Sequence, residues 1–340
     1  MIYNSLRAMA KESLLPYENV TREVLVRKDA KSSNSYGSNP DNRPMDQLIN
    51  YGVVNIDKPK GPTSHQVSSY VQKILGIQKS GHSGTLDPAV TGLLPIALGK
   101  ATKIVQLLLL AGKEYIALMH LHSEYPEYEI RKVMSEFVGK IKQMPPVKSA
   151  VKRQYRDRTI YYMEILDIKG QDVLFKVGCE AGTYIRKLIH DIGQKLGSGA
   201  HMQQLRRSKV ACYNESNIVT LQDLTDAYHY YKEDGDETDL RKIILPIETA
   251  CAHVPKIWVF DSTVDNLCHG ANLAIPGISK LESGIEPQQS VAILTLKGEL
   301  VGYGKSLLTS KKMIEEAKGF AVKVDKVFMQ PGTYPKIERL

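Results

Sequence analysis

The spacing of hydrophobic residues predicts several strands in the first two thirds of the chain. Residues 51–57 and 114–122 have the composition of strands, and residues 172–180 place alternate apolar side chains on one face. Residues 64–75 and 183–197 instead repeat apolar side chains at helical spacing. Because these strands and helices do not alternate strictly, we expect an α+β domain.

The expected helices have recognisable ends. Ser64 is the candidate N-cap of the first helix, and glycines 76 and 197 are typical of the C-terminal ends of the two helices. Residues 89–111, which follow a glycine-rich loop, are also expected to be mostly helical. The longest apolar run, from Ile104 to Gly112, is far shorter than the ~20 residues that span a membrane, so we interpret it as a buried helix.

The two ends of the chain differ from its middle. Residues 28–49 are polar and rich in Ser, Asn, Asp and Pro, which predicts a loop or an extended arm, not a packed element. From about residue 254, short strand-like runs around a Lys297–Gly298 turn predict a small β-rich barrel. A chain of 340 residues is longer than a single hydrophobic core usually supports. We therefore expect an N-terminal arm at 1–50, a first domain at 51–252 and the barrel at 253–340.

The balance of charge suggests a polyanionic partner. The chain carries a net charge of +8, from 45 Lys and Arg against 37 Asp and Glu. A dense basic patch lies next to Tyr155, Tyr161 and Tyr162, and cations beside aromatic rings favour phosphate contact together with base stacking. On charge alone, a solvated loop explains the patch equally well. Its basic residues are Lys148, Lys152, Arg153, Arg156 and Arg158.

The cysteines argue against a metal site. None of the four forms a C-x-x-C pair, and none lies near histidines at metal-ligand spacing. We expect reduced thiols in an intracellular protein, since the N-terminus also lacks the basic-then-apolar layout of a signal peptide. The four are Cys179, Cys212, Cys251 and Cys268.

The segment GHSGTLDP, from Gly81 to Pro88, is the strongest candidate for chemistry. Its glycines free the backbone, and Pro88 keeps Asp87 out of helical geometry, so the aspartate can project from a rigid loop. A plain Asp-Pro turn is the simpler alternative. Arg186 lies near a helix start, next to Tyr184, where the macrodipole disfavours a cation. Its anionic partner is therefore a structural acid, a substrate phosphate or a catalytic carboxylate, and these residues alone do not choose among them.

Five segments resemble, in the same order, the motifs of the TruB family of pseudouridine synthases. The central segment, GHSGTLDPAVTGLLPIALGKATKI at 81–104, is similar to the family's catalytic motif. The other four are NIDKPKGPTSHQV at 55–67, KEYIALMHLH at 113–122, CEAGTYIRKLIHDIG at 179–193 and HMQQLRRSKV at 201–210.

Within that family, the chain is most similar to the guide-RNA-dependent branch of archaea and eukaryotes, the dyskerin-like catalytic subunit of box H/ACA particles. SYGSNPDNRPMDQLINYG at 35–52 resembles its arm, MPPVKSAVKRQYRDRTIYY at 144–162 resembles its basic loop, and the tail resembles its PUA domain. Eukaryotic members usually add long Lys-rich tails, which this sequence lacks, so an archaeal origin is favoured. Gln66 stands where a glutamate is common, and we expect this change to be tolerated.

The resemblance implies an α+β catalytic domain with a mixed or antiparallel sheet, followed by a PUA β-barrel that binds RNA. Asp87 is then the catalytic carboxylate, and Arg186 pairs with it. Tyr115 stacks on a flipped uridine and Leu205 closes the other side of the base. The further pocket residues expected from the motifs are Tyr184, His82, Lys58 and Pro59, of which the last two brace the catalytic loop. The expected RNA-binding residues are Lys148, Lys152, Arg153, Arg156, Arg158, Arg206 and Arg207.

The resemblance also implies partners. They are a box H/ACA guide RNA, a substrate RNA and three accessory proteins: a Gly/Arg-domain protein, a small protein near the catalytic cleft and a kink-turn-binding protein. The substrate is expected to be rRNA, with the TΨC-loop uridine of tRNA as a further target. No cofactor or metal is expected, because the isomerisation is redox-neutral and needs no group donor. No membrane is involved, and the expected location is the archaeal cytoplasm, or the nucleolus of a eukaryote.

Two alternatives stay open. The catalytic motifs equally allow a stand-alone synthase that acts on the TΨC loop of tRNA. A non-catalytic RNA-binding scaffold fits the charge and the barrel, but it leaves Asp87, Tyr115 and Arg186 together unexplained.

Overall fold

The computed structural model describes residues 13–145, 152 and 154–336. The chain forms two compact units. The first contains residues up to Asn19, 89–92 and 110–210, and the second contains 20–88, 93–109 and the chain from Ala211 onward. Strands and helices are mixed in both, which confirms the predicted α+β class. The predicted domain boundaries at residues 50 and 252 divide the chain differently and stay a prediction.

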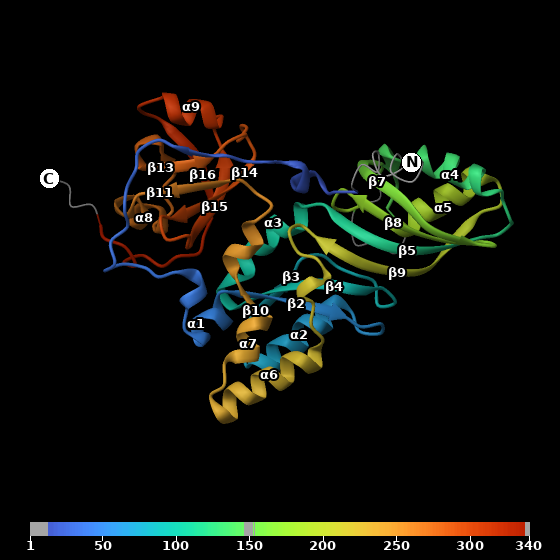
Figure 1. The fold of residues 1–340 in the computed structure, drawn as a ribbon, viewed down its shortest axis with the longest axis horizontal. Coiled ribbons are helices and arrows are strands. Elements are labelled where there is room, and N and C mark those ends of the chain that lie inside the picture. The colour runs from blue at the N-terminus through green and yellow to red at the C-terminus, as the bar shows by residue number, and fades with distance from the viewer. Residues whose placement is uncertain (1–12, 146–151, 153, 337–340) are drawn as a thin grey trace, which may run out of the picture. The chain divides into compact units, whose positions relative to one another are not determined.

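An antiparallel sheet forms the first unit, and two helices, α4 and α5, belong to it (Figure 1). The apolar alternation predicted at 172–180 is confirmed, because Val173, Phe175, Val177 and Cys179 are all buried. α5 packs on β9, and α4 packs on both α5 and β7. The sheet order is β9 (Ala200–Val210), β5 (Lys113–Leu121), β8 (Asp172–Cys179), β7 (Arg156–Lys169) and β6 (Gly139–Gln143), and the helices are α4 (Glu127–Ser135) and α5 (Ile185–Leu196).

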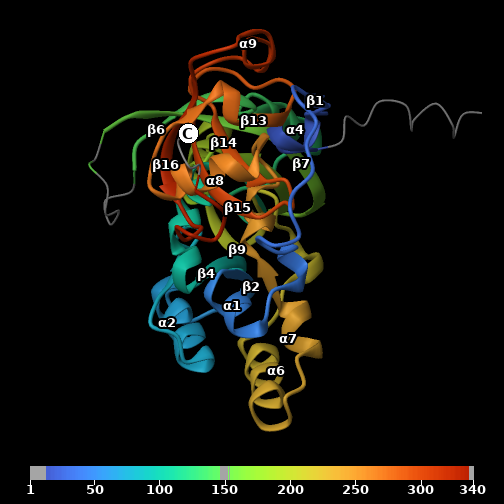
Figure 2. The ribbon, with the colours of Figure 1, turned by 90° about the vertical axis from the view of Figure 1, so that its left-hand side faces the viewer.

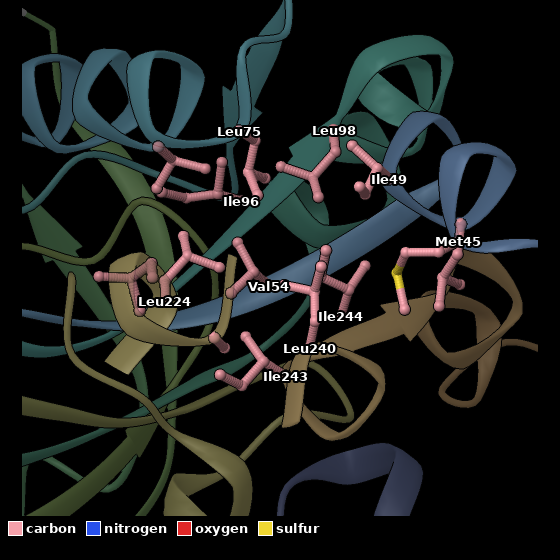
Figure 3. Close-up of a cluster of buried hydrophobic side chains, with 14 of the residues drawn as sticks. Met45, Ile49, Val54, Leu75, Ile96, Leu98, Leu224, Leu240, Ile243 and Ile244 are labelled. Atoms are coloured by element: carbon pink, nitrogen blue, oxygen red, sulfur yellow. The ribbon is translucent and has the colours of Figure 1, made fainter. Parts of the chain in front are cut away.

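Within the described residues, the second unit contains four strands of the nine-stranded sheet, with helices packed around them. Strand β2 (Gly52–Lys58) lies between β10 (Ile244–Pro246) and β4 (Thr91–Leu98), and β3 (Ser80–His82) pairs with β4. Val54, Ile96, Leu98 and Ile244 from this sheet meet apolar side chains of the helices in one buried cluster (Figure 3). The helices are α1 (Met45–Asn50), α2 (Ser64–Leu75), α6 (Leu221–Asp234) and α7 (Thr238–Ile243).

The predicted helix at 89–111 is mostly wrong. Residues 91–98 form β4, the chain then turns through a 3-10 helix at Gly99–Ile104, and only α3 (Val105–Leu110) is α-helical. The run from Leu93 to Leu98 is entirely buried. A short continuous apolar run fits a buried strand and a buried helix equally well, so spacing could not distinguish the two.

The predicted β-rich barrel forms from the tail together with one strand of the arm, β1. The Lys297–Gly298 turn connects β14 to β15 as expected, and Gly298 has a φ of +90°. Figure 2 shows these strands with α8 (Asp261–Cys268) and α9 (Ser310–Glu315). The strand order is β1 (Val24–Val26), β13 (Ile278–Glu282), β11 (Lys256–Val259), β14 (Ser290–Thr295), β15 (Leu300–Ser306), β16 (Phe320–Val327) and β12 (Leu273–Ala274).

The arm at 28–49 is mostly exposed and largely without regular structure up to Pro44, as predicted, but its end forms helix α1, which corrects the prediction that no part of it is packed. Ser32 Oγ donates to the Asp261 carboxylate at 3.0 Å, and the Ser38 N–H donates to Glu299 at 3.0 Å. Further on, α1 buries Met45 and Leu48 in the cluster of Figure 3. The polar composition of the arm hid this short apolar face, because so few residues repeat at helical spacing.

Glu248 connects three parts of the second unit. Its carboxylate accepts two hydrogen bonds from the Arg43 guanidinium, at 2.7 and 2.8 Å, and one from the Leu300 N–H at 2.8 Å. The Arg43 carbonyl also accepts a hydrogen bond from the Arg241 guanidinium at 3.0 Å. The Arg43 and Glu248 side chains are only 12% and 14% exposed, so this ion pair is largely desolvated.

We expect Arg43→Ala to destabilise the protein by about 2–4 kcal/mol, because it leaves a poorly hydrated carboxylate without its cation. Lys242→Ala, which removes an exposed ion pair with Asp239, is the matched control and should leave stability unchanged. Urea unfolding measures both. Equal effects of the two variants would show that the Arg43–Glu248 pair is not a structural connection.

Candidate active site

The backbone on both sides of Asp87 is held by hydrogen bonds. Before it, the Leu86 N–H donates to Ser64 Oγ at 2.8 Å, and the same hydroxyl donates back to the Leu86 carbonyl at 3.3 Å. After it, the Pro88 carbonyl accepts from Lys58 Nζ at 3.2 Å and from the Gly61 N–H at 2.9 Å. Asp87 itself is exposed, so a fixed backbone presents an accessible carboxylate.

Lys58 is the buried part of this arrangement. Its side chain is 0% exposed, and its ammonium also donates to the Pro59 carbonyl at 2.9 Å. A buried ammonium is costly unless acceptors surround it, so these carbonyls stabilise the lysine while the lysine fixes the loop. These bonds support a bracing role for Lys58 and Pro59, which stays a prediction.

Helix α2 also holds the loop, through the Ser64 hydroxyl. Its N-cap differs from the predicted residue. The cap is Thr63, whose Oγ accepts from the Gln66 N–H at 3.1 Å, while the Gln66 side chain accepts from the Thr63 N–H at 2.8 Å. Ser64 was predicted as the cap, but it is the first helical residue and its hydroxyl bonds Leu86 instead. Gln66 completes the same capping box that a glutamate forms.

His82 begins the aspartate loop at the end of β3. Its Nδ1 accepts from the Gly84 N–H at 3.4 Å, and its ring makes a T-shaped contact with the ring of His65, with the centroids 4.7 Å apart. These contacts give His82 a place in ordering the loop. His65, on the first turn of α2, had no role in the sequence analysis.

Tyr115 and Leu205 lie on neighbouring strands of the first unit. Tyr115 on β5 is 8% exposed and stands opposite Arg207 on β9. Two residues further along β5, Ala117 pairs with the half-buried Leu205. Because paired residues and residues two apart share one face of a sheet, Tyr115 and Leu205 lie on the same face.

Tyr184 and Arg186 lie at the N-terminal end of α5. Tyr184 is the N-cap residue, and Arg186 is exposed in the first turn. Gln143, at the end of β6 and 2% exposed, accepts from the Tyr184 N–H at 2.9 Å and donates to the Tyr184 carbonyl at 3.2 Å. Sequence reasoning missed Gln143, which is 41 residues away along the chain and belongs to no recognised motif.

Arg207 corrects an expectation. It was predicted to bind RNA, but it is 1% exposed, so its guanidinium has no surface on which to meet a phosphate. Burial lowers the pKa of Arg207, and a hydrogen bond and charge interaction with Tyr115 oppose that shift. Arg207 therefore lies in the interior beside Tyr115, on the neighbouring strand.

Lys113, two residues before Tyr115, is a second buried cation that the sequence did not single out. It is 6% exposed, and its ammonium donates to the Ala111 carbonyl at 2.8 Å. Burial, followed by the charge of Arg207, lowers the pKa of Lys113 from 10.5 to about 7. The interior near Tyr115 thus holds two basic groups.

The predicted basic patch is partly described. Lys152 and Tyr155 are exposed, whereas Arg156 and Arg158 are half-buried at the start of β7. Arg158 also lies 3.7 Å from the Glu180 carboxylate. Arg206 on β9 is half-buried. Lys148 and Arg153 lie outside the described residues.

Thiols and metal ligands form no cluster in the described part of the chain. The four cysteines are all free, as predicted. Within residues 13–145, 152 and 154–336, no group of His, Cys, Asp and Glu side chains is placed to hold a metal ion. No described helix is both long and apolar enough to cross a membrane.

Four protein-family models match the chain in succession. The N-terminal domain of the TruB family of pseudouridylate synthases matches residues 72–185, and the C-terminal domain of tRNA pseudouridylate synthase B matches 186–252. The DKCLD (NUC011) domain matches residues 13–68, and the PUA domain matches 255–328.

Two archaeal relatives, each named "Probable tRNA pseudouridine synthase B", match over nearly their full length. The protein from Nanoarchaeum equitans is 54% identical over 96% of this chain and 94% of its own. The protein from Pyrococcus abyssi is 55% identical over 95% of this chain and 97% of its own.

Two solved structures match equally broadly. A chain of a Cbf5–Nop10–Gar1 complex has a TM-score of 0.92 and 53% identity, and the match covers 96% of this chain and 99% of that one. A chain of an H/ACA RNP bound to a substrate RNA containing 2′-deoxyuridine has a TM-score of 0.90 and 51% identity, over 96% and 100% of the two chains.

We expect Ser64→Ala to loosen the aspartate loop, because it removes both hydrogen bonds to Leu86 and leaves two backbone groups unsatisfied. The expected loss of stability is about 1–3 kcal/mol, with faster hydrogen exchange of the Leu86 amide. Gln66→Glu keeps the capping box and is the control. An unchanged Leu86 exchange rate in Ser64→Ala would contradict the bracing role.

Lys113 should make the stability of the protein rise with pH. Its pKa is about 7 when folded and 10.5 ordinarily, so between these values the unfolded lysine keeps a proton that the folded one has released. From pH 7 to pH 9, the wild type should gain about 2 kcal/mol relative to Lys113→Met. Parallel pH profiles of the two proteins in urea unfolding would contradict the lowered pKa.

Proposed function

Because this chain belongs to the TruB family of pseudouridylate synthases, we propose that it isomerises uridine to pseudouridine as the catalytic subunit of a box H/ACA guide ribonucleoprotein. The observation that carries this proposal is the full-length match to the chain of the Cbf5–Nop10–Gar1 complex. The DKCLD match at the N-terminus and the PUA match at the C-terminus support it further.

The reaction breaks the N1–C1′ bond of a uridine and re-forms the link through C5. The base has to leave its helical stack to reach the enzyme. Asp87 starts the reaction, by attack on C1′ or C6 or by removal of a ribose proton. Arg186 pairs with Asp87 and keeps the carboxylate ionised and oriented. Support for both roles comes from the exposure of the two side chains, each beside a backbone that hydrogen bonds hold in place.

The remaining pocket residues surround the base. Tyr115 stacks on one face of the uracil and Leu205 closes the other, which their shared face of the sheet supports. Tyr184 shapes the pocket next to Arg186. Lys58, Pro59 and His82 order the loop that carries Asp87. Positioning of this kind accounts for a large share of catalysis when reacting groups are held in fixed geometry.

RNA contacts and partners complete the proposal. Exposed Lys152 and half-buried Arg156, Arg158 and Arg206 contact RNA phosphates, together with Lys148 and Arg153. The PUA barrel anchors one end of a guide RNA, and base pairing with the guide selects the target. Accessory proteins like Nop10 and Gar1, which accompany the matched Cbf5 chain, and a kink-turn-binding protein position the substrate. The enzyme acts in the cytoplasm of an archaeal cell, which the archaeal relatives support.

A second function has its own support. The relatives are named as probable tRNA pseudouridine synthases, which supports the alternative that this chain acts on tRNA. The TΨC-loop uridine, modified without a guide, is the target that the family resemblance implies. The test is to incubate the pure chain with tRNA, and with guide plus target RNA, with and without the accessory proteins, and to map pseudouridine in each. Full-rate modification of guided targets by the lone chain would defeat the guide-dependent proposal. Activity confined to tRNA would establish the second function instead.

Asp87→Asn should abolish isomerisation and leave RNA affinity nearly unchanged. The substitution keeps the shape of the side chain and removes its charge and basicity, while phosphate contacts by Lys and Arg dominate binding. Single-turnover rates and filter-binding affinities measure the two effects. A rate within about tenfold of wild type, or ~1.4 kcal/mol in the barrier, would show that Asp87 is not the catalyst.

A further inference from the structure

Arg207 and Tyr115 form a buried pair within the first unit. They stand opposite each other on β9 and β5, and they are 1% and 8% exposed. A hydrogen bond connects their side chains. Arginine has five N–H donors and no acceptor, so the guanidinium donates and the phenol oxygen accepts. The hydroxyl proton of Tyr115 therefore points away from Arg207.

This pairing puts a permanent positive charge at the phenol oxygen. An arginine keeps its charge under all ordinary conditions. Burying that charge costs free energy unless hydrogen bonds or an opposite charge offset the loss of water. Lys113 lies on the same face of β5 as Tyr115, two residues earlier, and interacts with the charge of Arg207. Because the pKa of Lys113 is about 7, Arg207 is the one of these two groups that stays charged above neutral pH.

Arg206, the neighbour of Arg207 in strand β9, is much less buried than Arg207. Adjacent residues of a strand point to opposite faces, and Arg206 is half-buried whereas Arg207 is enclosed. Arg206 thus lies nearer the surface, and Arg207 lies in the interior. Phosphate binding explains Arg206 but not Arg207.

We propose that Arg207 is a positioning residue of the uridine pocket that acts through Tyr115. It holds the phenol oxygen and the ring in one place against the flipped base, and its charge stabilises negative charge at that oxygen. The inference rests on the proposed function, because it takes Tyr115 as the side chain that meets the base.

A double-mutant cycle tests whether Arg207 acts through the Tyr115 hydroxyl. Single-turnover rates at saturating RNA are measured in the reconstituted complex for the wild type, Arg207→Met, Tyr115→Phe and the double variant. We expect Arg207→Met to slow the reaction by on the order of 30-fold with RNA affinity within about threefold, and to cost less than about threefold in Tyr115→Phe. Equal costs in both backgrounds, or weaker binding with an unchanged rate, would overturn the proposal. Lys169→Met, which removes an exposed cation on β7, is the control.

A spectroscopic measurement decides the same question without turnover. 3-Fluorotyrosine is placed at position 115 of the full chain, and its ¹⁹F resonance is followed against pH. The ionisation midpoint should rise by about one pH unit in Arg207→Met, and by less in Arg207→Lys, because a nearby cation favours the ionised phenol. Arg207→Lys replaces the Met variant if that variant does not fold, and still predicts a shift. An unchanged midpoint would overturn the proposal.

The two proposals fail in different ways. If the wild type forms no pseudouridine in any RNA, the proposed function fails while the ¹⁹F titration still reports on the Arg207–Tyr115 pair. If the wild type is active and Asp87→Asn is inactive, but Arg207→Met keeps the full rate, only the role of Arg207 fails.

Discussion

The position of Asp87 depends on hydrogen bonds to the peptide groups before and after it. Ser64 bonds both backbone groups of Leu86, and Lys58 bonds the Pro88 carbonyl from a fully buried position. Gln143 holds Tyr184 in the same way, through both of its backbone groups, two residues before Arg186. In both segments the backbone is fixed and the charged side chain is exposed, which is the arrangement that a preorganised site requires.

Burial gives the basic residues different functions. Lys58 and Arg207 lie in the interior, where they fix the loop backbone and the Tyr115 hydroxyl. Exposed Lys152 is free of these constraints and suits contact with a polyanion. Net charge alone therefore overstates the RNA-binding surface, since part of the positive charge acts inside the protein.

The sequence predicted strands and helices well where spacing and turn residues agreed, as in α5 with its terminal Gly197 and the barrel turn at Gly298. It failed at β4, because a fully buried strand has no polar face to reveal its period. Motifs singled out Asp87 and Arg186 as candidate site residues. They could not locate Gln143 or Lys113, whose roles arise only when the sheet brings distant residues together. The sequence predicted Arg207 at the surface, whereas the structure shows its side chain in the interior.

The pairing of Asp87 with Arg186 is the central claim, and an experimental structure of the RNA-free protein at high resolution tests it most directly. The decisive quantity is the distance between the Asp87 carboxylate oxygens and the Arg186 guanidinium nitrogens. We predict two parallel contacts of about 2.7–2.9 Å, the geometry of a bidentate arginine–carboxylate pair. A well-ordered Arg186 bound to another acid, with Asp87 beyond hydrogen-bond distance at more than about 4 Å, would contradict the claim.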